Sequence, residues 1–134
     1  MKTKPVVESS DVDLVLNACR AEARRLGLAM SIAIVDDAGY PLRLERMDGA
    51  GILTPSVALA KAKTAAIMRA PTRNLAERVR NEPELLRLED YMPMQGGLPM
   101  MSGGYCVGGV GLSGAKPEQD EQIAAAGCAA LLQG

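Results

Sequence analysis

The chain has 134 residues, a formal net charge of −1 and no histidine. Its length predicts one domain over residues 1–134, and no apolar run approaches the roughly 20 residues of a membrane-spanning helix. The balanced charge and the 2% aromatic content disfavour nucleic-acid binding, which uses basic surfaces and stacking rings. The lack of histidine excludes Ser-His and Cys-His catalysis and histidine-ligated zinc or haem.

The first part of the chain predicts a helix followed by a β-hairpin. Residues 1–8 are expected to form a loose lead. Apolar residues at helical spacing then predict a helix over 12–26, which Gly27 ends. Residues 30–35 are apolar on both faces, as is typical of a central strand, and residues 36–39 supply a turn into a return strand over 40–47.

The second part predicts further helices and the rest of the sheet. Helices are expected over 55–69 and 72–80, with a short helical turn at 83–89. Residues 91–104 are rich in Pro, Gly and Met and predict a long loop with a short strand at 98–101. A strand over 105–112 and a helix over 117–132 complete an α+β fold, in which helices pack on a mainly antiparallel sheet.

The three cysteines, at positions 19, 106 and 128, show no paired spacing. An odd number of cysteines fits free, mostly buried thiols in a reducing compartment. Residues 1–8 also lack the apolar segment of a signal peptide. We therefore predict a cytoplasmic location.

Two local patterns have simple structural interpretations. Gly109, Gly111 and Gly114 match the G-x-G-x-x-G pattern, but the chain offers no later strand for a dinucleotide-binding fold. We interpret these glycines as sites of close backbone packing. Methionines crowd residues 92–101, where their thioethers either fill irregular gaps or ligate copper(I) or haem iron.

Charged residues occur at positions where the periodicity predicts apolar ones. Arg46 follows Leu42 and Leu44 on one face of the return strand, so it enters the interior or lies past the end of the strand. Lys61 falls inside the predicted apolar stripe of its helix, where it either extends its ammonium to water or needs a buried partner.

The helix over 117–132 shows the corresponding acidic case. Asp120 falls among its apolar residues in the first turn, where it complements the helix dipole or is the counter-ion of Lys61 or Arg46. We hypothesise that Arg46, Asp48, Lys61 and Asp120 converge at one edge of the sheet.

The charge is also uneven along the chain. Residues 43–80 carry eight basic and three acidic groups, and residues 81–134 carry two basic and seven acidic groups. Such segments form solvated helix faces, a basic wall for an anionic ligand, or complementary patches in a self-assembly.

Seven short stretches, spread over about residues 12–130, resemble one family. They are VDDAG at 35–39, RMDGA at 46–50, AKAKTA at 60–65, GGLP at 96–99, VGLSGA at 110–115, QDE at 119–121 and AG at 126–127. They are similar to the GlcG/HbpS-like or haem-degrading domain family, which is related to the C-terminal domain of PduO. The resemblance implies a profilin-like α/β/α sandwich with a sheet of about five strands. It also implies homo-oligomers, often octamers, and links to haem binding or degradation.

From these features we predict a small-molecule pocket and a small anionic ligand. Its expected lining is Arg46, Lys61 and the segment Gly96, Gly97, Leu98, Pro99 and Met100. The resemblance implies that this ligand is haem or another anionic tetrapyrrole. Apart from the resemblance, the sequence identifies no cofactor. Without histidine, such a ligand would be held by Tyr, Met, Cys or a hydroxyl, or by packing alone. No metal site of the protein's own is predicted.

Two alternatives remain. One is a cofactor-free isomerase or lyase acting on a small anionic or aromatic catabolite, with Asp48 or Asp120 transferring a proton. The other is an assembly subunit without chemistry, whose alanine- and glycine-rich helices allow close packing between copies.

Overall fold

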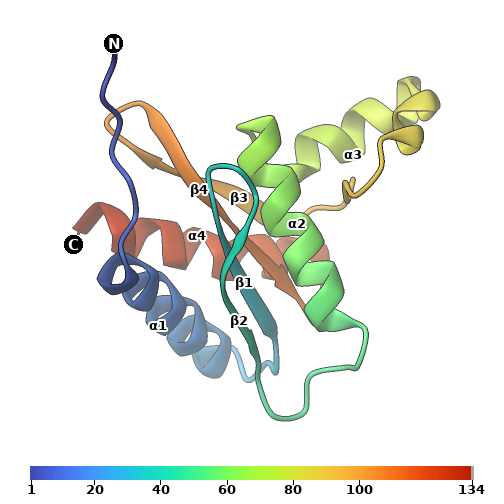
Figure 1. The fold of residues 1–134 in the computed structure, drawn as a ribbon. Helices are drawn as coiled ribbons and strands as arrows, with labels where there is room; N and C mark the ends of the chain where they lie inside the picture. The colour runs from blue at the N-terminus through green and yellow to red at the C-terminus, as the bar shows by residue number, and fades with distance from the viewer. Residues whose placement is uncertain (134) are drawn as a thin grey trace.

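The structure, a computed structural model, describes residues 1–133 and contains helices on both faces of a β-sheet (Figure 1). The elements are α1 (Ser9–Arg25), β1 (Ser31–Asp36), β2 (Pro41–Arg46), α2 (Thr54–Met68), α3 (Thr72–Asn81), the 3-10 helix η1 (Pro83–Arg87), β3 (Gly97–Ser102), β4 (Tyr105–Ser113) and α4 (Pro117–Gln133). This order agrees with the helices and strands that the sequence predicts. No helix among the described residues is long and apolar enough to cross a membrane.

The sheet has the strand order β2-β1-β4-β3, and every neighbouring pair is antiparallel. The predicted α+β class and the antiparallel sheet are therefore confirmed. The expectation of about five strands is wrong for residues 1–133, where the sheet has four. Residues 1–8 contain no helix or strand, although Lys4 forms an ion pair with Asp37 and Val7 packs against the core.

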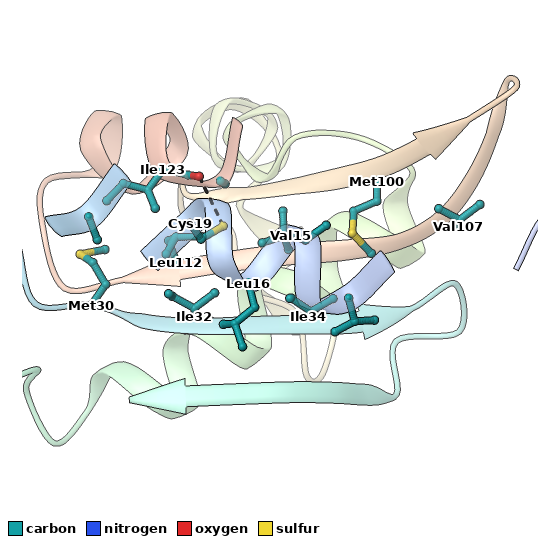
Figure 2. Packing of buried hydrophobic residues seen from close by; sticks show 14 residues of the cluster. Val15, Leu16, Cys19, Met30, Ile32, Ile34, Met100, Val107, Leu112 and Ile123 are labelled. Carbon is teal, nitrogen blue, oxygen red and sulfur yellow. Dashed lines mark hydrogen bonds between the residues drawn. The ribbon is translucent and has the colours of Figure 1, made fainter. Parts of the chain in front are cut away.

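The apolar pattern of β1 explains why helices cover both faces. Ile32 and Ile34 point to the side of α1 and α4, where they join the main core cluster (Figure 2). Ala33 and Val35 point to the other side, where they pack on alanines of α2. Successive side chains alternate between the two faces of a strand. A strand that is apolar throughout therefore needs a helix or another element packed on each face.

Glycines in β4 bring α2 unusually close to the sheet. A Cβ atom at Gly109 would lie 2.2 Å from the carbonyl oxygen of Ala62, and one at Gly111 would lie 2.1 Å from that of Ala58. Any side chain at either position would collide with the helix backbone. The interpretation of these glycines as close-packing sites is confirmed, and the result is a tight layer between α2 and β4.

The segment predicted as a long loop is more regular than expected. Its strand β3 extends over Gly97–Ser102, and Met100 is only 1% exposed within the main core (Figure 2). The prediction of a short strand inside residues 91–104 is correct. The expectation that Met100 lines a pocket is wrong, because its side chain fills space between β3 and the rest of the core.

Candidate functional site

A buried ion pair joins α2 to α4. The Lys61 Nζ atom lies 3.0 Å from Oδ2 of Asp120, and the two side chains are 2% and 4% exposed. Lys61 Nζ also donates a hydrogen bond to the Leu112 carbonyl oxygen at the end of β4, at 3.0 Å. The other Asp120 oxygen accepts a hydrogen bond from the Ala115 amide at 3.1 Å. The hypothesis that Asp120 is the counter-ion of Lys61 is confirmed.

Close packing of α2 explains how a lysine becomes buried. The residues of α2 that lie against the sheet are mostly alanines, and Lys61 lies among them. The predicted apolar stripe of this helix included Val57, Ala60 and Ile67. It is partly wrong, because Val57 and Ala60 are only half-buried and Ile67 is 37% exposed. Alanines of α2 face the glycines of β4 because only small side chains fit there, whereas Lys61 extends to Leu112 at the end of β4 and to Asp120 of α4.

Burial dominates the electrostatics of this pair. Desolvation raises the pKa of the Asp120 carboxyl above its ordinary value, and the Lys61 ammonium and the Ala115 amide oppose that rise only in part. Asp120 is 3% exposed overall, so a substrate has no access to it in this conformation. The pair therefore acts here as a cross-brace between α2, β4 and α4.

Two adjacent glycines cover the ion pair. A Cβ at Gly96 would lie 2.7 Å from Lys61 Nζ and 2.9 Å from Cβ of Asp120, and its φ of +132° favours glycine. A Cβ at Gly97 would lie 2.5 Å from the Lys61 carbonyl oxygen. The Gly97 amide donates a hydrogen bond to Thr72 Oγ1 at 2.9 Å, which joins this segment to the start of α3. These glycines act through backbone packing.

Arg46 and Asp48 lie elsewhere, so the predicted convergence of four charged residues is wrong. Both line an open hollow of about 410 Å³ at the end of β2, together with Arg20, Arg24, Glu45 and Met47. Arg46 is exposed, and its Nε and Nη2 donate to the Ala50 carbonyl oxygen at 3.0 and 2.8 Å. Leu44, on the same face, is 48% exposed. Because α2 lies mainly over β4 and β1 and contacts the edge strand β2 much less, Arg46 at the end of β2 is open to solvent.

A second hollow, which the sequence did not predict, lies between α3 and the first turn of α4. Its volume is about 570 Å³, and its lining includes Arg73, Asn74 and Arg80 from α3, Met94 and Gln95 before β3, and Glu118 from α4. Gly96, the residue after Gln95, packs on the buried pair. Arg73 and Arg80 belong to the basic stretch over residues 43–80, for which a basic wall was one interpretation, but the sequence did not place that wall. We call this hollow the α3–α4 hollow.

Much of the charge asymmetry along the sequence is neutralised within the chain. Arg73 forms an ion pair with Glu121, and Lys63 Nζ lies 3.8 Å from Asp90. Arg78 likewise pairs with Glu82 at 3.1 Å. The basic segment and the acidic segment thus face each other around α3, as solvated and partly paired surfaces.

The remaining predicted lining residues lie on β3. Leu98 and Pro99 are half-buried. The Pro99 carbonyl oxygen accepts a hydrogen bond from Cys128 Sγ at 3.7 Å. Leu98 packs against the main core. Neither residue contributes to the lining of the α3–α4 hollow.

The three cysteines are free thiols, and burial raises the pKa of both Cys19 and Cys128 to about 12. Cys19 and Cys128 are therefore protonated at neutral pH and are poor nucleophiles. Cys19 Sγ instead contacts the Ile123 carbonyl oxygen at 3.5 Å inside the core (Figure 2). Among residues 1–133 there is no group of three His, Cys, Asp or Glu side chains placed to hold a metal ion.

Fold and site together define a small α+β domain in which an antiparallel sheet lies between α1 and α4 on one side and α2 on the other. Residues 7–129 match the family described as "Haem degrading protein HbpS-like", and the chain belongs to this family. It is 33% identical over 114 residues to Protein GlcG of Escherichia coli K12, which covers 84% of this chain and 85% of that protein. The predicted family resemblance is thereby confirmed.

Solved structures agree with this assignment. A double mutant of Streptomyces reticuli HbpS has a TM-score of 0.90 and 33% identity, with 96% of this chain and 89% of that chain covered. A crystal structure of a PduOC:heme complex has a TM-score of 0.87 and 27% identity, with coverages of 94% and 95%. The helices and strands described above are thus those of the family.

Proposed function

We propose that this protein binds haem or another anionic tetrapyrrole in the α3–α4 hollow. The size of that hollow and the residues that line it are the main support for the proposal. Its volume of about 570 Å³ lies within the range of about 300–1,000 Å³ typical of small-molecule sites. Its wall contains two guanidinium groups, Arg73 and Arg80, two carboxylates, Glu77 and Glu118, and one thioether, Met94.

The residues of the hollow fit the chemistry of haem. The Arg80 side chain is 79% exposed, and its Nη1 lies 3.7 Å from Oε1 of Glu77, a weak surface pair that a propionate would have to displace. Arg73 would share its charge between a propionate and Glu121. Met94 is 47% exposed, and a thioether is an axial haem ligand in proteins. Bound haem would supply an iron centre whose redox potential depends on that axial ligand.

Two further facts support haem as the first ligand to test. The family description names haem degradation, and a structural neighbour with 27% identity is a heme complex. Under this proposal Lys61 acts only through Gly96, and Arg46 has no part in tetrapyrrole binding. The binding roles predicted for Lys61 and Arg46 from the sequence are thus replaced by Arg73, Arg80 and Met94.

The test is a titration of the tag-free protein with haemin, followed by visible absorbance. We expect a saturable Soret shift at one haemin per chain or fewer. Met94→Leu should change the position of the Soret band, and Arg80→Met should weaken binding. The matched control is Met101→Leu, since Met101 is 40% exposed but lies outside this hollow. A shift equal to that of an unrelated protein, or one unaffected by both hollow variants, would exclude the proposal.

Self-association and a cytoplasmic location stay proposals. The family resemblance implies a homo-oligomer, often an octamer, and light scattering of the purified protein would measure its mass. Free thiols at all three cysteines are compatible with a reducing compartment. The alternative of a proton-transfer enzyme stays a prediction, and Asp120 would need movement of Gly96 to reach a substrate.

A further inference from the structure

The strand β2 forms one edge of the sheet, and its outer side pairs with no other strand of residues 1–133 (Figure 2, lowest strand). The Met47 amide donates to the Met30 carbonyl oxygen at 2.9 Å, and the pairing with β1 continues in register to Arg43. In an antiparallel pair, residues that bond to the neighbouring strand alternate with residues whose N–H and C=O groups point away from it. The backbone groups of Leu44 and Arg46 therefore point out of the sheet.

The opposite edge of the sheet, β3, is closed by the chain itself. The Gly97 amide donates to Thr72 Oγ1 at 2.9 Å. Pro99 has no N–H group, and its carbonyl oxygen accepts a hydrogen bond from Cys128 Sγ at 3.7 Å. No side chain or turn of residues 1–133 bonds to the outward groups of Leu44 in this way. Of the two edges, β2 is therefore the one that can pair with a further strand.

The side chains of β2 make this edge complementary to itself. Arg43 and Glu45 lie on the α1 face of the sheet, whereas Leu44 lies on the α2 face and is 48% exposed. When two copies of β2 are paired antiparallel about a two-fold axis at Leu44, Arg43 of each copy lies opposite Glu45 of the other. Axes at Arg43, Glu45 or Arg46 would place like charges opposite each other, which is destabilising. Charge thus selects the register centred on Leu44.

We propose that two copies of this chain associate edge to edge through β2, so that their sheets form one continuous antiparallel sheet. In this register the outward N–H and C=O groups of Leu44 bond to those of Leu44 in the second copy, and the two exposed leucine side chains cover each other. The proposal rests on the self-association proposed for this protein and specifies one of its interfaces. It uses no residue of the α3–α4 hollow.

The helix α1 already orients both charged side chains of this edge. Arg43 Nη2 lies 3.1 Å from Oδ1 of Asp13, and Arg20 Nη2 lies 2.6 Å from Oε1 of Glu45. Pairing of two copies would join these ion pairs into two rows of alternating charge, one on each side of the axis. Charges that are held in place lose less conformational freedom when they meet a partner, so the interface gains from the existing pairs.

The experiment uses two complementary charge reversals. Arg43→Glu leaves only acidic groups at positions 43 and 45, and Glu45→Arg leaves only basic ones. Each variant should repel itself and associate about tenfold or more weakly than the unchanged protein, as measured by sedimentation velocity. An equal mixture of the two variants should recover the association of the unchanged protein, because each supplies the charge that the other lacks. The control Arg25→Glu, at an α1 residue that pairs with Glu22, should associate like the unchanged protein.

A backbone variant tests the hydrogen bonds of the same edge. Leu44→Pro removes an N–H that points out of the sheet, so it should abolish the association while the protein still unfolds cooperatively in urea. Undiminished association in all three β2 variants, or a mixture that associates no better than its components, would exclude the β2 interface and leave self-association standing. An unchanged protein that is monomeric at every concentration would exclude both. Haemin binding should be equal in all these variants, so the tetrapyrrole proposal is tested separately.

Discussion

The Lys61–Asp120 pair and the Arg46–Asp48 region contain the same kinds of charged group in opposite surroundings. Lys61 and Asp120 are almost completely buried, and each satisfies the other at 3.0 Å. Arg46 and Asp48 are exposed, and Arg46 is held by a backbone carbonyl rather than by an acid. A buried charge must be compensated inside the protein, whereas an exposed charge stays available to a ligand. The first pair thus stabilises the fold, whereas the charges of the second region remain accessible from solvent.

The largest expected effect is that of Lys61→Met on stability. This change leaves the Asp120 carboxylate buried without its partner, which typically costs about 3–5 kcal/mol. The free energy of unfolding, measured by urea denaturation, should fall by that amount. Lys63→Met is the matched control on the same helix, and it should change stability by about 0.5 kcal/mol or less since its side chain is 36% exposed. Equal losses in the two variants would contradict the assignment of Lys61 as a structural brace.

A double change tests whether the loss comes from the unpaired charge. Asp120→Asn removes the negative charge but keeps an oxygen that can accept the Ala115 amide. We expect Lys61→Met with Asp120→Asn to be more stable than Lys61→Met alone, by about 1 kcal/mol or more. Additive losses in this double-mutant cycle would show that packing, and not charge compensation, accounts for the effect.

The sequence predicted the buried pair because both of its members interrupt apolar stripes. Lys61 and Asp120 each stood at a helical position that their neighbours marked as interior. Because Asp120 also stood on the apolar face of its helix, the sequence offered it as the counter-ion of Lys61 or Arg46, and the structure pairs it with Lys61. The same reasoning failed for Arg46, since it assumed that Leu44 faces the core. Whether an edge strand is buried depends on how far the covering helix extends over it. The alternation of side chains along the strand gives no information about that helix.

The α3–α4 hollow could not be predicted from local patterns. Two of its residues, Arg73 and Arg80, belong to α3, and Met94 lies in the segment before β3. Only the path of residues 81–96 brings these side chains together. The sequence also could not show that Met100 enters the core while Met94 stays at the surface. Both methionines lie in one Pro- and Gly-rich stretch, where periodicity carries little information.

A smaller effect is expected from Gly96→Ala, which tests the cover of the buried pair. The new Cβ would lie 2.7 Å from Lys61 Nζ at a backbone φ of +132°, so we expect a loss of about 1–3 kcal/mol. Gly104→Ala is the control, because Gly104 also has a positive φ of +83° but has nothing within 4 Å of its Cβ position. A loss at Gly96 no larger than that at Gly104 would mean that backbone strain alone is measured and that the pair is not tightly covered.

The smallest effect concerns the pH dependence of the two regions, which should have opposite signs. The Arg20 guanidinium lowers the pKa of Glu45 below its usual 4.5, so Glu45 contributes stability above pH 4.5 that is lost as the pH falls through its folded pKa. Relative to Glu45→Gln, the unchanged protein should gain about 0.2–1 kcal/mol as the pH rises through this window.

Desolvation raises the pKa of Asp120 above 3.8, which reverses the sign. Asp120 contributes stability below pH 3.8 that is lost as the pH rises through its folded pKa, because the folded state holds that proton more tightly. The unchanged protein should therefore lose stability relative to Asp120→Asn over the same rise in pH. Urea denaturation of both variants between pH 3 and pH 6 measures the two slopes. Slopes of the same sign would mean that Lys61 outweighs the burial of Asp120, and the buried pair would then behave electrostatically like the half-buried Arg20–Glu45 pair.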